Sequence, residues 1–177
     1  MRKIWMPIAA LLLAAAILLG AYNLTLDIRQ ENQQKELQAK METLLPGSTT
    51  FTQETYTGED GNISLVYKGE TGYVIGTSTA GYAGTIRMLI GVSNDGYVTG
   101  LQVREMEETF GLGGEALSDW EFLAQFLRTE GDAAVGENID AISGATVTSK
   151  AITRSVNSAV AFVTGSDVDS GATSWGG

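Results

Sequence analysis

The sequence predicts an α+β fold, in which an antiparallel sheet is covered by helices. Short apolar or alternating runs follow one another through the middle of the chain and are separated by turns that contain glycine. A stretch near the C-terminal end has the spacing of an amphipathic helix. The 177 residues include 22 glycines and only 2 prolines, which suits strands and tight turns. This length fits one modest domain with an anchor better than two full domains.

The first segment, residues 1–22, predicts a transmembrane anchor. Residues 4–22 contain no charged side chain and are long enough to cross a bilayer as a helix. Arg2 and Lys3 precede this run and no basic excess follows it, so the N-terminus is expected in the cytoplasm and the rest of the chain outside. A cleaved signal peptide is the alternative, although its apolar region is usually about 7–15 residues. Both interpretations export the domain.

Three further segments complete the expected organisation. Residues 23–47 predict a helical stalk, because polar side chains outnumber apolar ones there and Pro46-Gly47 ends the helix near Leu45. The folded domain is expected over residues 48–165. Residues 166–177 are polar and rich in glycine, which predicts a flexible tail.

Within the domain, the apolar patterns predict a series of strands. The expected strands are residues 63–68, 72–77, 85–92 and 97–105, with a last strand near residues 138–142. Asn94-Asp95-Gly96 predicts a hairpin turn, because an Asp-Gly pair suits the positive φ angles of such turns.

Two helices are expected on this sheet. Ser118 and Glu121 form a predicted capping box that starts a short helix ending near Arg128. A longer helix is expected from Ser149 to about Val163, and Gly165 predicts its end. Its small and apolar residues recur on one face, which should pack on the sheet.

Composition excludes several classes of site. The chain has no histidine and no cysteine, so it lacks a Ser-His-Asp triad and the ordinary ligands of zinc, haem and iron–sulfur clusters. We therefore predict no metal site and no catalytic residue. A hydrolase that uses a pair of carboxylates is an alternative that this composition allows. A redox role would need an organic cofactor. Beyond residue 22 there are 9 basic and 21 acidic residues, which argues against nucleic acid as a partner.

The strongest chemical signal is the segment from Asp140 to Thr148. It is expected to contain a strand end, a turn of small residues and the start of a helix. Gly144 and Ala145 would let a bulky group approach the backbone, while Ser143, Thr146 and Thr148 offer hydroxyls. The backbone N–H groups of a helix start favour an anion, typically a phosphate. The same residues also fit an ordinary helix cap, so both interpretations stay open.

The pattern Asp140-x-x-Ser143-Gly144-Ala145-Thr146 resembles the flavinylation motif of the FMN-binding domain family. This family includes the G subunits of Rnf ion-translocating ferredoxin:NAD oxidoreductases and the C subunits of sodium-translocating NADH:quinone reductases. The resemblance implies one FMN joined covalently to Thr146 by a phosphoester bond, transferred from FAD by a dedicated flavin transferase. A separate enzyme is chemically reasonable, because a threonine hydroxyl is a weak nucleophile and no histidine is present to activate it.

A second stretch is similar to the same family. Residues 81–92, the turn at Asp95-Gly96 and the loop 108–113 match its usual order of strand, turn, strand and loop. In the family this loop lies against the isoalloxazine ring. Phe110 replaces the usual proline and Met106 stands where histidine is common. The resemblance therefore does not determine how rigid this loop is. The resemblance thus implies FMN-binding residues beside Thr146, namely Ser143, Gly144, Ala145, Thr148, Glu108, Thr109, Leu112 and Gly113.

The resemblance implies the electron-transfer G subunit of a membrane-bound Rnf complex, which works with membrane and iron–sulfur subunits and has no complete activity alone. The alternatives are a related exported covalent flavoprotein, the C subunit of a quinone reductase, or a non-redox binding module. The short chain favours the G subunit over the usually longer C subunit. Asp167 to Thr173 repeats the motif near the C-terminus, but no helix follows, so Thr173 is expected to be a chance match.

Overall fold

The computed structural model describes residues 29, 31–106 and 119–166. The chain divides into two compact units, Met1–Lys40 and Met41–Gly177. In the first unit, residues 31–40 are helical, and two ion pairs at i,i+4 spacing join Lys35 to Glu31 and Lys40 to Glu36. No helix in the described ranges is both long and apolar enough to span a bilayer. The predicted anchor lies outside those ranges.

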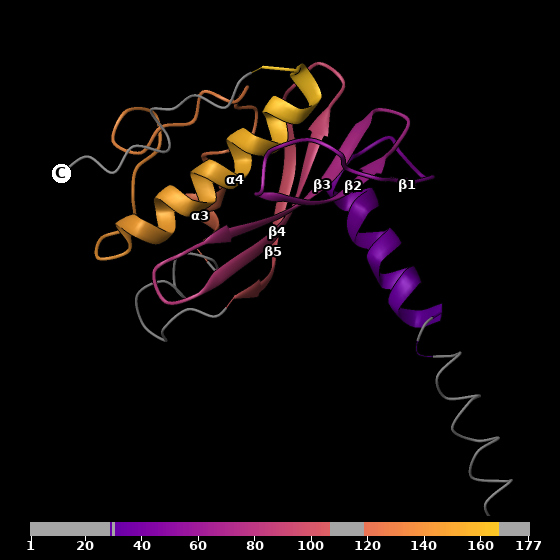
Figure 1. Ribbon diagram of the computed structural model, residues 1–177, viewed down its shortest axis with the longest axis horizontal. Helices are drawn as coiled ribbons and strands as arrows, with labels where there is room; N and C mark the ends of the chain where they lie inside the picture. The colour runs from indigo at the N-terminus through magenta and orange to yellow at the C-terminus, as the bar shows by residue number, and fades with distance from the viewer. Residues whose placement is uncertain (1–28, 30, 107–118, 167–177) are drawn as a thin grey trace, which may run out of the picture. The chain divides into compact units, whose positions relative to one another are not determined.

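The second unit is built on a five-stranded antiparallel sheet in which each strand pairs with the next one along the chain (Figure 1). The strands are β1 (Thr52–Glu54), β2 (Ile63–Lys68), β3 (Gly72–Ala80), β4 (Thr85–Ser93) and β5 (Val98–Met106). Such a meander needs only short connections, which explains the many glycine-containing turns. The predictions of β2, β3, β4 and β5 are confirmed, and β3 extends three residues beyond its predicted end.

Two strand assignments differ from the predictions. β1 was not predicted, because its three residues are all exposed and carry no apolar pattern. The strand expected near residues 138–142 is wrong. Only one isolated bridge joins Val135 and Ile139 there, and the side chain of Asn138 holds the loop by accepting a hydrogen bond from Ala134 N at 2.7 Å. An asparagine that binds its own neighbouring backbone favours a turn over a sheet ladder.

The helices also begin at residues other than those predicted. In α3 (Trp120–Ala124) the N-cap is Asp119, not Ser118, because the Asp119 carboxylate accepts hydrogen bonds from the N–H groups of Glu121 and Phe122. α4 (Thr146–Thr164) starts three residues before the predicted Ser149. Its end is confirmed at Gly165, whose φ of 70° is the left-handed conformation that glycine adopts readily.

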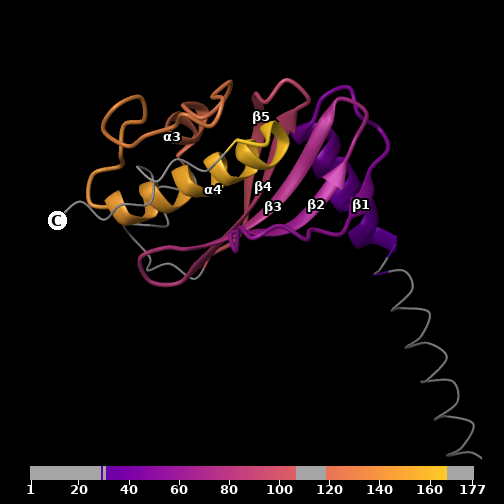
Figure 2. The same cartoon turned by 45° about the horizontal axis from the view of Figure 1, so that its top comes forward.

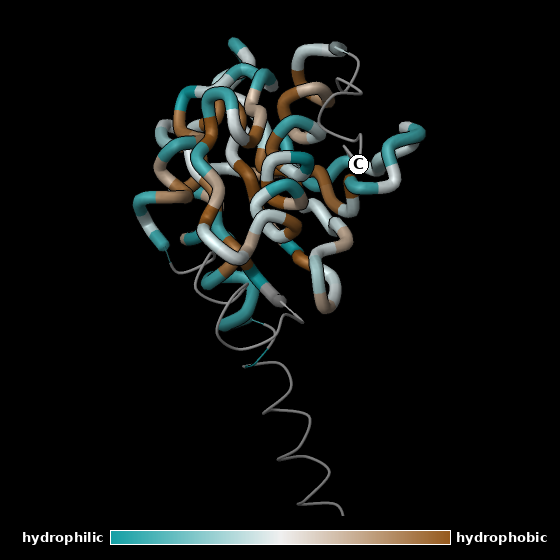
Figure 3. The backbone as a smooth tube through the Cα atoms, turned by 90° about the vertical axis from the view of Figure 1, so that its left-hand side faces the viewer, coloured by the Kyte–Doolittle hydropathy of each residue, from teal (hydrophilic) through white to brown (hydrophobic). Residues whose placement is uncertain are grey.

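α4 covers one face of the sheet and builds the main core (Figures 1 and 2). Ile75 and Ile90 of the sheet and Ile152 of α4 are fully buried at this interface. A buried hydrogen bond of 2.7 Å joins the hydroxyls of Thr79 and Ser155, so these polar residues are paired where the helix meets the sheet. Figure 3 shows the apolar segments inside this unit and the polar ones at its outer turns.

The other face of the sheet is covered partly by residues 41–45. Met41, Leu44 and Leu45 are buried there, close to two glycines, Gly91 of β4 and Gly100 of β5. A β-bulge adds one residue to β5 at Thr99, whose hydroxyl donates a 2.5 Å hydrogen bond to the Leu44 carbonyl. The two glycines leave room for the Leu44 backbone to contact the sheet directly.

The Glu70 carboxylate accepts hydrogen bonds from the segment that leads into β1. The Thr50 hydroxyl donates to this carboxylate at 2.8 Å, and the Thr49 and Thr50 N–H groups also donate to it. The hydrogen bond from the Thr50 side chain, followed by one from the Glu70 backbone and those from the Thr50 and Thr49 backbones, lowers the pKa of Glu70 from 4.5 to about 2. Since the folded pKa is depressed, the stabilisation is complete above pH 4.5 and is lost as the pH falls towards 2.

We therefore expect the Glu70 carboxylate to titrate near pH 2 when followed by NMR of the folded protein. Thr50→Ala removes the largest single cause of the shift and should move the midpoint back towards 4.5. Thr52→Ala, in an exposed strand residue nearby, is the control and should leave it unchanged. A midpoint near 4.5 in the unmodified protein would contradict the assignment.

Candidate functional site

The segment between Ile142 and Thr146 forms a tight turn at the start of α4. Gly144 has a φ of 80°, a conformation that other residues seldom adopt, so the small residue predicted here has a definite backbone role. The Ala145 N–H donates to the Ile142 carbonyl at 2.9 Å. The buried Ser149 hydroxyl donates to the Ala145 carbonyl at 3.0 Å and accepts from the Ile142 N–H at 3.3 Å. Ser149 thus clamps both sides of the turn.

This turn leaves the N-terminus of α4 without a side-chain cap. The N-cap residue is Ala145, which has no hydroxyl or carboxylate to offer, and no side-chain cap hydrogen bond is formed. The first turn also contains no acidic residue. The helix-cap interpretation of these hydroxyls is therefore wrong for α4. The first backbone N–H groups and the positive end of the helix dipole are left to attract an anion.

The predicted site residues differ strongly in exposure. Thr146 is the first residue of α4 and is exposed, as are Ser143 and Gly144, whereas Ala145 and Thr148 are buried at 4% and 1% exposure. Thr148 therefore supports the helix from within the protein and offers no hydroxyl to a bulky ligand. Thr146 is the threonine of this motif that a large group can reach.

Positive charge on the first turns of α4 comes from two partly exposed residues. Lys150 and Arg154 follow Thr146 by about one and two turns, and both are half-buried. The Nε atom of Arg154 is buried without a hydrogen-bond partner among the described residues. Two positively charged residues thus lie on the same helix as Thr146.

The turn between β3 and β4 lies beside the N-terminal end of α4 in both Figures 1 and 2. This turn holds Tyr82, whose side chain is 74% exposed. Sequence reasoning did not identify Tyr82 as a site residue, because exposure beside the helix start depends on how the sheet folds under α4. An exposed aromatic side chain of this kind offers a flat surface for stacking.

The remaining predicted site residues lie outside the described ranges. Glu108, Thr109, Leu112 and Gly113 fall within residues 107–118, which directly follow β5. Their proposed part in binding FMN therefore stays a prediction.

Comparison with known proteins identifies the family. A model of the FMN-binding domain matches residues 81–161, which contain β4, β5 and most of α4, including Thr146. The G subunit of an ion-translocating oxidoreductase complex from Methanosarcina acetivorans is 38% identical, over 85% of this chain and 87% of its own length. The chain belongs to this family of G subunits.

Two further members of the family show the same relationship. The G subunit of a proton-translocating ferredoxin:NAD(+) oxidoreductase complex from Clostridium ljungdahlii is 30% identical, over 86% of this chain and 85% of its own. The G subunit of a Na(+)-translocating ferredoxin:NAD(+) oxidoreductase complex from Acetobacterium woodii is 36% identical, over 60% of this chain and 53% of its own. The resemblance to the FMN-binding domain family, first suggested by short motifs, is confirmed.

Proposed function

We propose that this protein is the electron-transfer G subunit of a membrane-bound ion-translocating ferredoxin:NAD oxidoreductase, and that it carries one FMN on Thr146. The observation that supports this most is the exposed Thr146 at a helix start that has no side-chain cap. A phosphate attached at the Thr146 hydroxyl oxygen would meet unpaired backbone N–H groups and the positive end of the helix dipole.

The attachment is a phosphoryl transfer that needs no oxidant. The Thr146 oxygen would attack the phosphorus of the FMN half of FAD, so that the pyrophosphate bond breaks, AMP leaves and the hydroxyl proton is released. The chain has no histidine to activate the hydroxyl, which is consistent with a separate flavin transferase as the catalyst. The turn held by Ser149, in which Gly144 has a φ of 80°, keeps the Thr146 backbone in place.

Bound FMN supplies one- and two-electron redox chemistry that the amino acids of this chain lack. The chain contributes the attachment point and, by the resemblance, a loop around Glu108 and Leu112 against the ring. Covalent attachment keeps the cofactor in place outside the cytoplasm. Without histidine, cysteine or a dinucleotide fingerprint, the chain depends on membrane and iron–sulfur subunits for its electron donors and acceptors.

We also propose that residues 1–22 anchor the protein in the cell membrane as a single span, with the N-terminus cytoplasmic and the flavin domain on the opposite side. The uncharged run of residues 4–22 and the basic pair before it support this orientation. Residues 23–47 would then act as the stalk between the bilayer and the domain.

The intact mass of the full-length chain tests the proposal. After co-expression with a flavin transferase we expect an increase equal to one FMN less one water. Expression without the transferase should give the unmodified mass. A colourless, unmodified chain purified from its native host would refute the covalent cofactor.

A further inference from the structure

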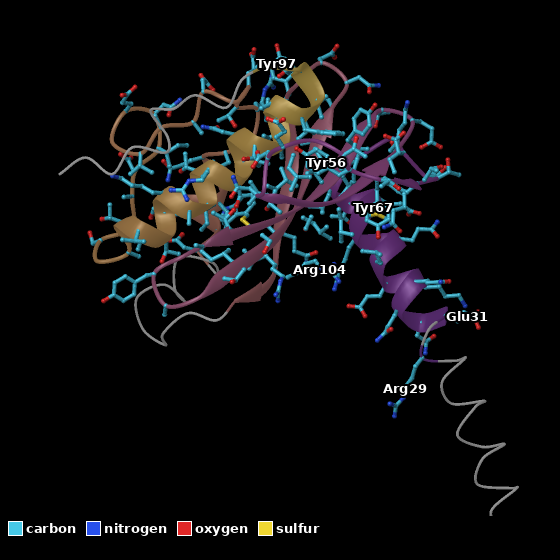
Figure 4. All side chains as sticks on the ribbon, viewed as in Figure 1. Arg29, Glu31, Tyr56, Tyr67, Tyr97 and Arg104 are labelled. Carbon is cyan, nitrogen blue, oxygen red and sulfur yellow. The ribbon has the colours of Figure 1, made fainter. Side chains whose placement is uncertain are left out.

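A shallow hollow on the sheet contains two arginines. It has a volume of about 160 Å³ and is lined by Ser64, Leu65, Thr77, Arg87, Met88 and Arg104. Thr77 and Met88 are register partners on β3 and β4, and their side chains, at 1% exposure each, share the α4 face with Thr79 and Ile90. The strand backbone at these two residues therefore forms the floor of the hollow. Figure 4 shows Arg104 on the side of the sheet away from α4. The hollow is therefore separate from the helix start that carries Thr146.

Two β-bulges build the rim of this hollow. Between Ile63 and Leu65 the strand β2 advances two residues while its partner β3 advances one, so Ser64 is the additional residue. In β5 the same irregularity makes Arg104 the additional residue, between the partners of Arg87 and Met88. Each bulge thus adds one of the polar residues that line the hollow. Bulges are over-represented beside active sites, where they redirect a side chain.

The hollow concentrates positive charge in an acidic protein. The chain has a formal net charge of −10, yet the lining residues include two arginines and no carboxylate. Both arginines are exposed, and Arg104 forms no ion pair with the described side chains. The Arg104 guanidinium therefore has charge to offer to an external anion.

The size of the hollow limits what this anion can be. A cavity needs roughly 10–15 Å³ of volume open to the centre of a water molecule in order to hold one water. The hollow has about 160 Å³ of the same volume, which holds a group of several heavy atoms but not a folded segment. Guanidinium groups donate planar pairs of N–H bonds that match the oxygens of phosphate. The Ser64 hydroxyl donates to the Gly76 carbonyl at 3.0 Å, which holds the rim in place without using either arginine.

We propose that this hollow binds a phosphate group, held by Arg104 and Arg87. The phosphate comes either from free inorganic phosphate or from the headgroup of an anionic phospholipid. This site is independent of the FMN on Thr146, since none of its residues belongs to α4 or to the turn before it.

The test is the thermal unfolding midpoint of the full-length chain in phosphatidylcholine nanodiscs. Two arms are compared. In the first, inorganic phosphate is added to the nanodiscs, and chloride at equal ionic strength is its control. In the second, the nanodiscs contain phosphatidate and the buffer contains no free phosphate. A ligand that binds the folded state raises the midpoint, and the concentration dependence gives an apparent Kd. Arg104→Gln and Arg87→Gln are measured beside Lys68→Gln, which removes a positive charge from an exposed position on β2 that does not line the hollow.

We expect one arm to stabilise the unmodified chain and Lys68→Gln alike. Arg104→Gln should weaken the apparent affinity about fivefold or more, the loss typical of a partly exposed charged hydrogen bond. Stabilisation by inorganic phosphate identifies a free-phosphate site, and stabilisation by phosphatidate alone identifies a lipid headgroup site. The proposal is overturned if neither arm stabilises the protein, or if both arginine variants respond as the unmodified chain does.

Discussion

Replacing Thr146 with alanine should remove the covalent FMN completely. The variant loses the oxygen to which the phosphate would be joined, while the turn held by Ser149 and Gly144 keeps its hydrogen bonds. Since Thr146 is exposed and the helix start has no side-chain cap to lose, little stability should be lost. Intact mass and flavin fluorescence of the denatured chain on a gel measure the effect directly.

Two controls make this result specific. Thr146→Ser keeps the hydroxyl and should keep flavin, since the same P–O bond can form. Thr173→Ala changes the repeated motif near the C-terminus and should leave the adduct unchanged. If Thr146→Ala still carries one FMN, the attachment lies elsewhere, and loss of the adduct in Thr173→Ala would assign it to the second motif.

Replacing Gly91 with alanine should cause a large loss of stability for the addition of a single methyl group. A Cβ atom there would lie 2.1 Å from the Leu44 carbonyl oxygen and 2.7 Å from its carbon, and both are backbone atoms that no rotamer change can move. Residues 41–45 would have to leave the sheet, which would also break the hydrogen bond from Thr99 to Leu44. We expect a cost of about 3 kcal/mol, at the upper end of overpacking effects.

This prediction can be measured as the free energy of unfolding in denaturant, followed by circular dichroism. Gly61→Ala is the matched control, because no atom lies within 4 Å of the added Cβ and the residue is exposed. Its stability should stay within about 0.5 kcal/mol of the unmodified chain. Equal stability of Gly91→Ala and Gly61→Ala would mean that Leu44 does not contact the sheet as described.

Local patterns in the sequence were sufficient to predict β2 to β5 and the end of α4. The apolar residues of β2 to β5 recur in short runs, and Gly165 supplies the left-handed conformation that stops the helix. These signals depend on neighbours in the chain and on local backbone preferences. They did not fix the start of α4, because Thr146 to Thr148 have no apolar periodicity and the residue at the cap is an alanine.

Local sequence patterns were also insufficient for β1 and for residues 138–142. β1 is a strand because Glu54 and Thr52 pair with β2, not because of its own composition. Ile139 belongs to the segment predicted as a strand but lies in a loop, where the Asn138 side chain accepts a hydrogen bond from the backbone of Ala134. In each case the competing interaction comes from a partner that a sequence pattern does not identify.

The sequence by itself determined the α+β class and the resemblance to FMN-binding domains, and it supplied the prediction that Thr146 carries the flavin. These depend on residue types at fixed spacing along one stretch of chain. Only the tertiary structure decided that Thr146 is exposed while Thr148 is buried, and that Ser64, Arg87 and Arg104 from three strands share one hollow. The reason is physical: burial and the register shifts at β-bulges depend on which strands pair and on what packs against them.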